Sequence, residues 1–266
     1  MKNIVHSTHF IQASQGQVYA EQWHVADSQH APIILLHDSL GCVALWRDFP
    51  LRLAQCTERT VIAYDRVGFG QSFEQKQMID PDFVRLEAKT TFQLVRNFFQ
   101  ILDFVVLGHS VGGGMALCCA AQYPQDCRAV ITIAAQAFNE AQTIAGIKEA
   151  QIAFQNAEQF QRLEKYHAEK TQWVLDAWIK TWLAPIFENW NMDQMVRKVV
   201  SPSLIMHGEF DEYGSLAHPH RFQALLGDRA QVEILKDCYH TPHKEQPQLV
   251  LNLIVEFLNQ SVDKSF

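Results

Sequence analysis

The stretch DFVVLGHSVGGGMALCCAAQYP, residues 103–124, decides the fold of this chain. Its first six residues are mostly apolar and β-branched and predict a buried strand, and the residues after the turn predict a helix. Between them stands GHSVG, residues 108–112, a G-x-S-x-G sequence in the strand-turn-helix setting that this motif requires. A sharp turn from strand to helix exposes the side chain at its corner, so Ser110 is a candidate nucleophile.

The neighbours of Ser110 support this interpretation. Gly108 and Gly112 leave room for the strand and the helix to cross closely, and the helix N-terminus would direct N–H groups toward an oxyanion. Serine is also a common N-cap residue, so helix capping alone is the alternative. A serine hydroxyl is a weak nucleophile at neutral pH, and catalysis would therefore need a base and a group that orients the base.

Two later loops contain such groups. The loop after PSLIMH, residues 202–207, holds three competing acids: Glu209, Asp211 and Glu212. The loop after QVEILK, residues 231–236, holds two histidines: His240 and His243. Ligand-facing residues collect at the carboxyl ends of parallel strands, and the order serine, acid, histidine is the one expected for an α/β fold with this elbow.

The remaining strand patterns predict an α/β fold with a mostly parallel sheet. Six short apolar runs alternate with helical patterns, at residues 32–37, 60–65, 103–108, 128–134, 202–207 and 231–236. Residues 8–13 and 17–24 flank Ser14-Gln15-Gly16 and predict a hairpin. The expected sheet has about eight strands and is flanked by helices.

A helical insert is expected at residues 137–195, between two parts of one core domain, 1–136 and 196–266. Three tryptophans of the insert, Trp173, Trp178 and Trp182, are spaced five and four residues apart. They could pack against the core, or they could belong to a lid whose inner face shapes an apolar pocket.

Composition limits the class of protein and its partners. The 266 residues include 48% hydrophobic and 19% charged residues and have a formal net charge of −7. This predicts a globular chain and, without a Lys/Arg run, no nucleic-acid partner. The chain shows neither a signal-peptide pattern nor a membrane-spanning stretch, so a cytoplasmic location is expected. The six cysteines form no C-x-x-C pair and are interpreted as buried small hydrophobes.

Four blocks of sequence, GHSVGG, YDRVGFGQS, MHGEFDEYG and CYHTPHKEQP, resemble the α/β-hydrolase superfamily, in its lidded esterase, C–C hydrolase and haloperoxidase-like branch. The resemblance covers nearly the whole chain except the insert. It implies Asp211 as the acid, because the family acid stands three residues after the glycine that ends the strand. It implies His240 as the base, because His240 precedes Thr241-Pro242, and it leaves His243 as the runner-up.

The same resemblance implies an oxyanion hole made by the main-chain N–H groups of Ser39 and Val111. Asp38 stands where the family usually carries glycine, and we expect its carboxylate to point away and bind the backbone or a cation such as Arg66. Residues 65–72, DRVGFGQS, are expected to fix neighbouring loops rather than to react, and they do not continue as a dinucleotide-binding motif.

The predicted function is a serine hydrolase that cleaves a small-molecule carboxylic ester with an apolar part, through an acyl-enzyme and without a cofactor. Hydrolysis of a C–C bond in a diketone-like substrate is the alternative, and a non-catalytic binding protein is the alternative from another class. A metal site that uses His218, His220, His240 and His243 is disfavoured, because no clustered acids or cysteines stand at ligand spacing.

Overall fold

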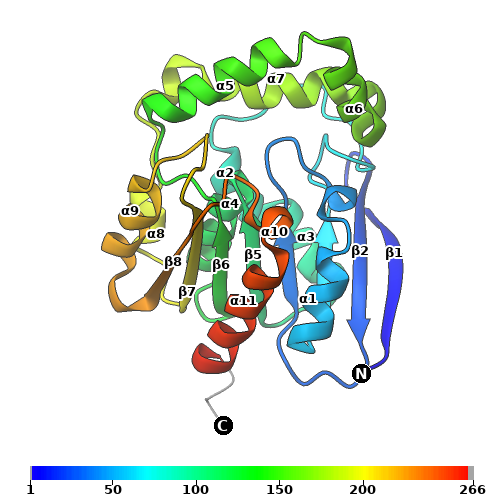
Figure 1. Cartoon of the computed structure of the whole chain (residues 1–266). Helices are drawn as coiled ribbons and strands as arrows, with labels where there is room; N and C mark the ends of the chain where they lie inside the picture. Colours follow the sequence, from blue (N-terminus) through cyan, green and yellow to red (C-terminus); the bar gives the residue numbers. More distant parts are fainter. Residues whose placement is uncertain (1, 263–266) are drawn as a thin grey trace.

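The computed structural model describes residues 2–262, and its centre is an eight-stranded sheet in the order β1-β2-β4-β3-β5-β6-β7-β8 (Figure 1). β1 pairs with β2 and β2 with β4 in antiparallel fashion, and all the other neighbours are parallel. The strands are Ile4–Gln12 (β1), Gln17–Val25 (β2), Ile33–Leu36 (β3), Val61–Tyr64 (β4), Phe104–His109 (β5), Cys127–Ile133 (β6), Ser203–Gly208 (β7) and Ala230–Leu235 (β8). The expected eight-stranded, mostly parallel sheet is confirmed.

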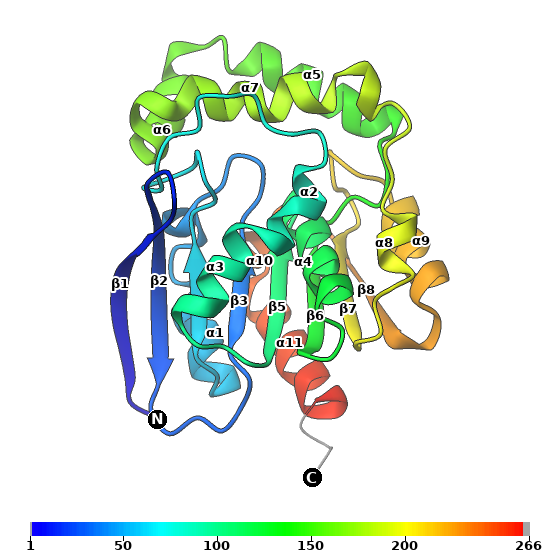
Figure 2. The ribbon, with the colours of Figure 1, turned by 180° about the vertical axis from the view of Figure 1, so that it is seen from behind.

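Helices cover both faces of this sheet and its upper end. The α-helices are Phe49–Thr57 (α1), Phe83–Leu86 (α2), Thr91–Phe98 (α3), Val111–Gln122 (α4), Ala141–Ala153 (α5), Ala157–His167 (α6), Thr171–Trp182 (α7), Asp193–Val196 (α8), Ala217–Leu226 (α9), Pro242–Glu245 (α10) and Pro247–Ser261 (α11). Short 3-10 helices lie at Val43–Trp46, Glu87–Lys89, Ala168–Lys170, Pro185–Phe187 and Gly227–Arg229. Figures 1 and 2 show α1 and α11 on one face and α2, α3 and α4 on the other.

The central strands separate two apolar cores because successive side chains of a strand point to opposite faces. In β5, Phe104 and Val106 belong to the core beneath α3 and α4, whereas Val105 and Leu107 belong to the core beneath α1 and α11. All four of these side chains are fully buried. Both faces of β5 are thus covered, which explains why its sequence is continuously apolar rather than alternating.

The edge strand β1 begins at Ile4, four residues before the expected start. Its side chains are mostly exposed or half-buried; Val5 and Phe10, for example, are each 51% exposed. An edge strand with one pairing neighbour has little to bury, so its apolar pattern is weak and its start is hard to place from the sequence.

Two regions stand above the carboxyl ends of the parallel strands. One is the upper layer, formed by α5, α6 and α7, which falls within the expected insert (Figure 1). The other is residues 65–82, which contain no helix or strand and run beneath α7 as the cyan segment between β4 and α2 (Figure 2). Within residues 2–262, no helix has the length and apolar character needed to cross a membrane.

Candidate active site

Ser110 occupies the corner between β5 and α4 with a backbone conformation of φ 55° and ψ −125°. A positive φ costs a non-glycine residue about 1–3 kcal/mol, so the surrounding structure must hold it. The Ser110 N–H donates to the Ile133 carbonyl at 2.8 Å, and the Gly113 N–H donates to the Ser110 carbonyl at 2.9 Å. Ser110 is the N-cap residue of α4, yet its hydroxyl makes no capping hydrogen bond and is left for another partner.

The glycines of this elbow are required by close packing. A Cβ atom on Gly108 would lie 2.0 Å from the Gly112 carbonyl oxygen, and one on Gly112 would lie 2.2 Å from the Leu36 carbonyl oxygen. No side chain fits at such distances, so β3, β5 and the start of α4 can approach one another only with glycine at both positions.

The structure brings Ser110 together with His240 and Asp211, which come from two other strand ends. His240 Nε2 lies 3.0 Å from Ser110 Oγ, and His240 Nδ1 lies 2.8 and 2.9 Å from the two carboxylate oxygens of Asp211. Asp211 is 3% exposed and Ser110 is 6% exposed. A hydrogen-bonded chain therefore runs from a buried carboxylate through an imidazole to a hydroxyl.

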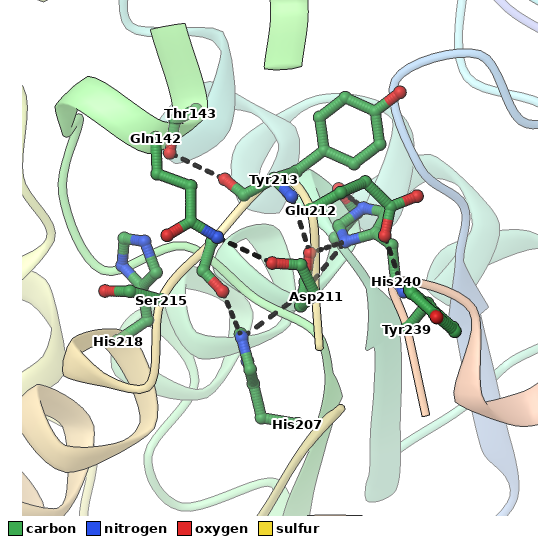
Figure 3. A network of polar contacts seen from close by, with 12 residues as sticks. Gln142, Thr143, His207, Asp211, Glu212, Tyr213, Ser215, His218, Tyr239 and His240 are labelled. Carbon is green, nitrogen blue, oxygen red and sulfur yellow. Dashed lines mark hydrogen bonds and ion pairs between the residues drawn. The ribbon is translucent and has the colours of Figure 1, made fainter. Parts of the chain in front are cut away.

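Several further contacts fix Asp211 (Figure 3). Its Oδ1 accepts the Tyr213 N–H at 2.8 Å, and its Oδ2 lies 3.3 Å from His207 Nε2. Its main-chain carbonyl accepts a hydrogen bond from the Gln142 side chain at 2.7 Å. The acid is thus held by its own loop, by β7 and by the first turn of α5.

The electrostatic consequences for Asp211 and His240 are opposite in sign. Burial opposes ionisation of Asp211, but the neighbouring His240 and the hydrogen bond between them outweigh burial and lower the pKa of Asp211. Burial likewise opposes protonation of His240, but the Asp211 carboxylate outweighs it and raises the pKa of His240. An ionised Asp211 therefore favours the protonated form of the His240 ring.

The competing residues in these loops have other partners. His243 is buried against the rings of Trp46 and His109, and its ring centroid is 4.7 Å from that of His109. A Glu209 oxygen accepts the Asp237 N–H at 3.3 Å, and a Glu212 oxygen accepts the His240 N–H at 3.2 Å. The turn thus directs only the middle acid, Asp211, at the imidazole ring.

The two N–H groups expected to form an oxyanion hole belong to segments that adjoin the Ser110 turn. Val111 begins α4, and Ser39 follows β3, which pairs with β5. Neither N–H donates a hydrogen bond to another residue between positions 2 and 262. Both donors are thus available to a developing negative charge, and their assignment stays a prediction.

The contacts of the Asp38 carboxylate agree only in part with those expected from the sequence. Its Oδ1 accepts the Leu40 N–H at 2.9 Å, which is the expected backbone contact, but its Oδ2 lies 3.2 Å from His109 Nδ1. Arg66 instead donates from Nη2 to the Asp38 main-chain carbonyl at 2.9 Å. Burial works against the charge of Asp38, yet His109 and Lys244 outweigh it and hold the pKa of Asp38 well below its usual value.

His109 connects this turn to the loop of the base. Its Nε2 donates to the His240 carbonyl at 2.8 Å, while its Nδ1 faces Asp38. Sequence reasoning did not assign a role to His109, because it occupies the variable position of the G-x-S-x-G motif and its partners come from distant loops.

Residues 65–72 fix neighbouring loops, as their sequence suggests. Asp65 accepts the Val43 and Gln71 N–H groups at 2.6 Å each and is buried. His167 and Lys170 of the upper layer also bind here: His167 Nδ1 accepts the Gly70 N–H at 2.9 Å, and Lys170 Nζ donates to the Gly70 carbonyl. The upper layer is therefore attached to the core at this end as well as through Gln142.

A pocket of about 240 Å³ opens onto Ser110 and His240. Its apolar lining comes from the core and the upper layer: Leu40, Leu45, Ile147, Leu163, Trp178 and Trp182. Of the three tryptophans noted in the sequence, Trp178 and Trp182 line this pocket, and Trp173 packs over Gly68 instead. The pocket suits a substrate with an apolar part.

The four histidines weighed as metal ligands have separate surroundings. His218 Nε2 lies 2.9 Å from a Glu140 oxygen, and its Nδ1 accepts the Ala137 N–H at 3.1 Å. Among the residues that the structure describes, no group of three or more His, Cys, Asp or Glu side chains could hold a metal ion.

An elbow serine, a buried acid and a histidine, gathered at the carboxyl end of a mostly parallel eight-stranded sheet, define the class of α/β hydrolases. The model of the alpha/beta hydrolase fold family matches residues 31–177, and the chain belongs to this family.

Curated relatives match over limited segments. Abhydrolase domain-containing protein abhd-5.2 of Caenorhabditis elegans is 35% identical over 109 residues, which are 41% of this chain and 24% of that protein. A (lyso)-N-acylphosphatidylethanolamine lipase of Bos taurus is 30% identical over 102 residues, 38% of this chain and 29% of that protein. A human protein named 1-acylglycerol-3-phosphate O-acyltransferase ABHD5 is 29% identical over 119 residues, 44% of this chain and 33% of that protein. The matches thus span about a quarter to a third of these relatives.

Solved structures match nearly the whole chain at low identity. A proline iminopeptidase of Mycobacterium smegmatis superposes with a TM-score of 0.78 at 20% identity, covering 98% of this chain and all of that chain. A putative lipase of Acinetobacter baumannii gives 0.75 at 21% identity, covering 98% and 93%. A meta-cleavage product hydrolase of Pseudomonas fluorescens gives 0.72 at 19% identity, covering 95% and 97%. These similarities establish the fold.

Proposed function

We propose that this protein is a serine hydrolase that cleaves carboxylic esters with an apolar acyl part. The observation that carries the proposal is the continuous chain of hydrogen bonds from Asp211 through His240 to the Ser110 hydroxyl. A base within 3.0 Å of a serine hydroxyl, itself oriented by a buried carboxylate, is the arrangement that activates a serine for acyl transfer.

In the proposed reaction, Ser110 Oγ attacks the acyl carbon of the ester while His240 Nε2 takes the hydroxyl proton. The Ser39 and Val111 N–H groups stabilise the tetrahedral oxyanion. The bond to the alcohol oxygen breaks, and His240 returns the proton to the departing alcohol. Water then attacks the acyl-enzyme, gives a proton to His240 and releases the carboxylic acid, with Ser110 reprotonated.

The insert at residues 137–195, which contains the upper layer, is proposed to act as a lid over the pocket. Ile147, Leu163, Trp178 and Trp182 contribute its apolar surface to the pocket. A lid of this kind excludes water from the acyl carbon and selects the group that is bound. The relatives named as a lipase and as an acyltransferase act, by those names, on acyl groups, which is compatible with an acyl-enzyme.

The test combines a covalent probe with an ester assay. A fluorophosphonate should label the protein once, and Ser110→Ala should abolish both labelling and hydrolysis of p-nitrophenyl butyrate. Ser14→Ala, which changes an exposed serine in the β1–β2 turn, should leave both unchanged. Undiminished hydrolysis by Ser110→Ala would exclude the proposed nucleophile, and cleavage of a β-diketone without cleavage of any ester would favour a C–C hydrolase.

A further inference from the structure

A second cavity lies near the start of α7, whereas the catalytic pocket lies near the end of that helix. It has a volume of about 340 Å³, and its walls come from residues 65–82, α2 and the start of α3, with Trp173 of α7 above. Its apolar lining consists of Val67, Phe69, Phe73, Ile79, Phe83 and Leu86. The reaction proposed above makes no use of this space.

A third, small space, called the neck, is lined by residues of both cavities. Its volume is about 10 Å³, and it shares Ser39, Trp178 and Trp182 with the catalytic pocket. It shares Arg66, Phe69, Ile79 and Phe83 with the second cavity. The three spaces therefore adjoin one another through shared side chains, and each is lined by at least one residue of α7; together they are called the passage.

Specific contacts hold the loop and the Trp173 ring that line this passage. Gly68 has a φ of 89°, and a Cβ atom there would lie 2.4 Å from the ring of Trp173, so the loop and the ring fit only with glycine. The Trp173 Nε1–H donates to the Gln77 carbonyl at 2.9 Å. Segments of 12 to 15 or more residues without helix or strand are uncommon in compact domains unless they serve function, and residues 65–82 exceed that length.

The charged side chains at the inner end are engaged by the protein. Arg66 donates to the Asp38 carbonyl, and its guanidinium carbon lies 4.1 Å from the centre of the Phe69 ring. Glu87 accepts the Tyr64 hydroxyl at 2.6 Å. The rest of the cavity lining combines the apolar side chains named above with Gln15, Gln75, Asp80, Thr90 and Thr91.

The position of the neck relative to His240 indicates which part of an ester, the acyl chain or the alcohol, faces it. The departing alcohol must receive its proton from His240 Nε2 and therefore lies beside His240. The neck includes Ser39 but none of the pocket residues on the histidine side, namely Tyr213, His240 and Thr241. The group opposite the departing alcohol is the acyl chain, so the neck lies on the side of the catalytic pocket where we place that chain.

We propose that this passage binds the distal part of a long, unbranched acyl chain, which makes long-chain carboxylic esters the substrate class. The proposal rests on the ester hydrolase function proposed above. A neck of about 10 Å³ has room for at most one water molecule, so side chains must turn aside when the chain enters. Ile79 is suited to this movement, because it is only partly buried and lies on the segment without secondary structure.

The test is to close the neck and measure chain-length preference. Ile79→Trp should fill the neck from the loop side, and Met78→Trp is the matched control, because Met78 is the adjacent residue, is 52% exposed and does not line the passage. We expect Ile79→Trp to lower kcat/KM for p-nitrophenyl dodecanoate at least about tenfold and to leave p-nitrophenyl acetate within about twofold, because only the long ester loses buried methylene groups. Met78→Trp should change neither.

A second variant that narrows the neck keeps the test valid if Ile79→Trp fails to fold. Ala177→Leu narrows the neck from α7, and a thermal melt identifies any variant that has lost its fold. Equal losses for both esters in the folded variants, or no loss for either, would overturn the passage while Ser110-dependent hydrolysis of the acetate preserves the proposed function. Failure of the wild-type protein to hydrolyse any ester would overturn both.

Discussion

The loops that hold Ser110, Asp211 and His240 differ from the upper layer above them in how they are fixed. In the loops, each reacting group has a polar partner within about 3 Å, and the backbone is held by strand pairing on either side. The upper layer contributes mostly apolar rings and aliphatic chains to the pocket and is attached to the core by polar contacts near its ends. This difference supports the proposal that the loops carry out the chemistry and that the upper layer selects the substrate.

The largest effect is expected where the polar chain is broken in the loops. Asp211→Asn should lower kcat by about 10⁴, because an amide no longer holds the His240 tautomer that accepts the Ser110 proton or stabilises the imidazolium. The loss should be equal for p-nitrophenyl acetate and dodecanoate, since both need the same proton transfer. Steady-state kinetics on both esters measure it.

Asp237→Asn is the control for that change, because Asp237 is exposed and lies in the loop that carries His240. It should retain wild-type kcat. A loss that differed strongly between the two esters in Asp211→Asn would contradict the separation between chemistry and substrate selection.

The next effect concerns pH. His240 must be neutral to accept a proton, and Asp211 raises its pKa above the usual 6.5. The value of kcat/KM should therefore fall tenfold for each pH unit below the pKa of His240, which lies above 6.5. This falling part of the pH profile is its acid limb, and Asp211→Asn should move it to lower pH. Stability has the opposite sign: the raised pKa contributes to the free energy of unfolding fully below about pH 6.5, and this contribution is lost as the pH rises through the folded pKa.

His243→Asn provides the matched control for the pH profile. Burial holds the pKa of His243 well below 6.5, so it is neutral across this range and its removal should leave the acid limb in place. A flat profile between pH 5 and 9 in the wild-type protein would contradict His240 as the base.

The core of the fold could be predicted from the sequence because its signals are local. The strand β5, the glycines of the elbow and the following helix are adjacent in the chain, and burial on both faces makes the strand continuously apolar. The edge strand β1 was placed less well, because an exposed strand leaves little pattern.

For the site, the residues alone predicted which loop carries the acid but not which acid of that loop contacts the histidine. Glu209, Asp211 and Glu212 have similar chemistry, and the direction in which each points depends on a turn that the residues alone do not specify. The selection of Asp211 came from the family resemblance. In the structure Glu209 accepts the Asp237 N–H, Glu212 accepts the His240 N–H, and Asp211 binds the His240 ring. The contact between Asp38 and His109 and that between Gln142 and Asp211 were not predictable, because each joins segments about 70 residues apart in the chain.

The smallest effect on kcat is expected from the contact between the upper layer and the loop that carries Asp211, here called the acid loop. Thr143 Oγ1 donates to the Tyr213 carbonyl at 2.7 Å, two residues beyond Asp211. Thr143→Val removes this hydrogen bond at nearly constant volume, and a net contribution of about 0.5–1.5 kcal/mol corresponds to a loss of about two- to tenfold in kcat if the bond positions Asp211.

Thr171→Val is the matched control, because Thr171 is equally buried in the upper layer and donates to the Ala168 carbonyl within that layer. Both variants should lower the melting temperature similarly, since each leaves a carbonyl without its hydroxyl donor, but only Thr143→Val should lower kcat. Because the Tyr213 carbonyl belongs to the acid loop, its loss should affect short and long esters alike, unlike closure of the neck. Equal kcat values in the two variants would mean that the upper layer touches the acid loop without positioning it, and substrate selection would then be its only contribution.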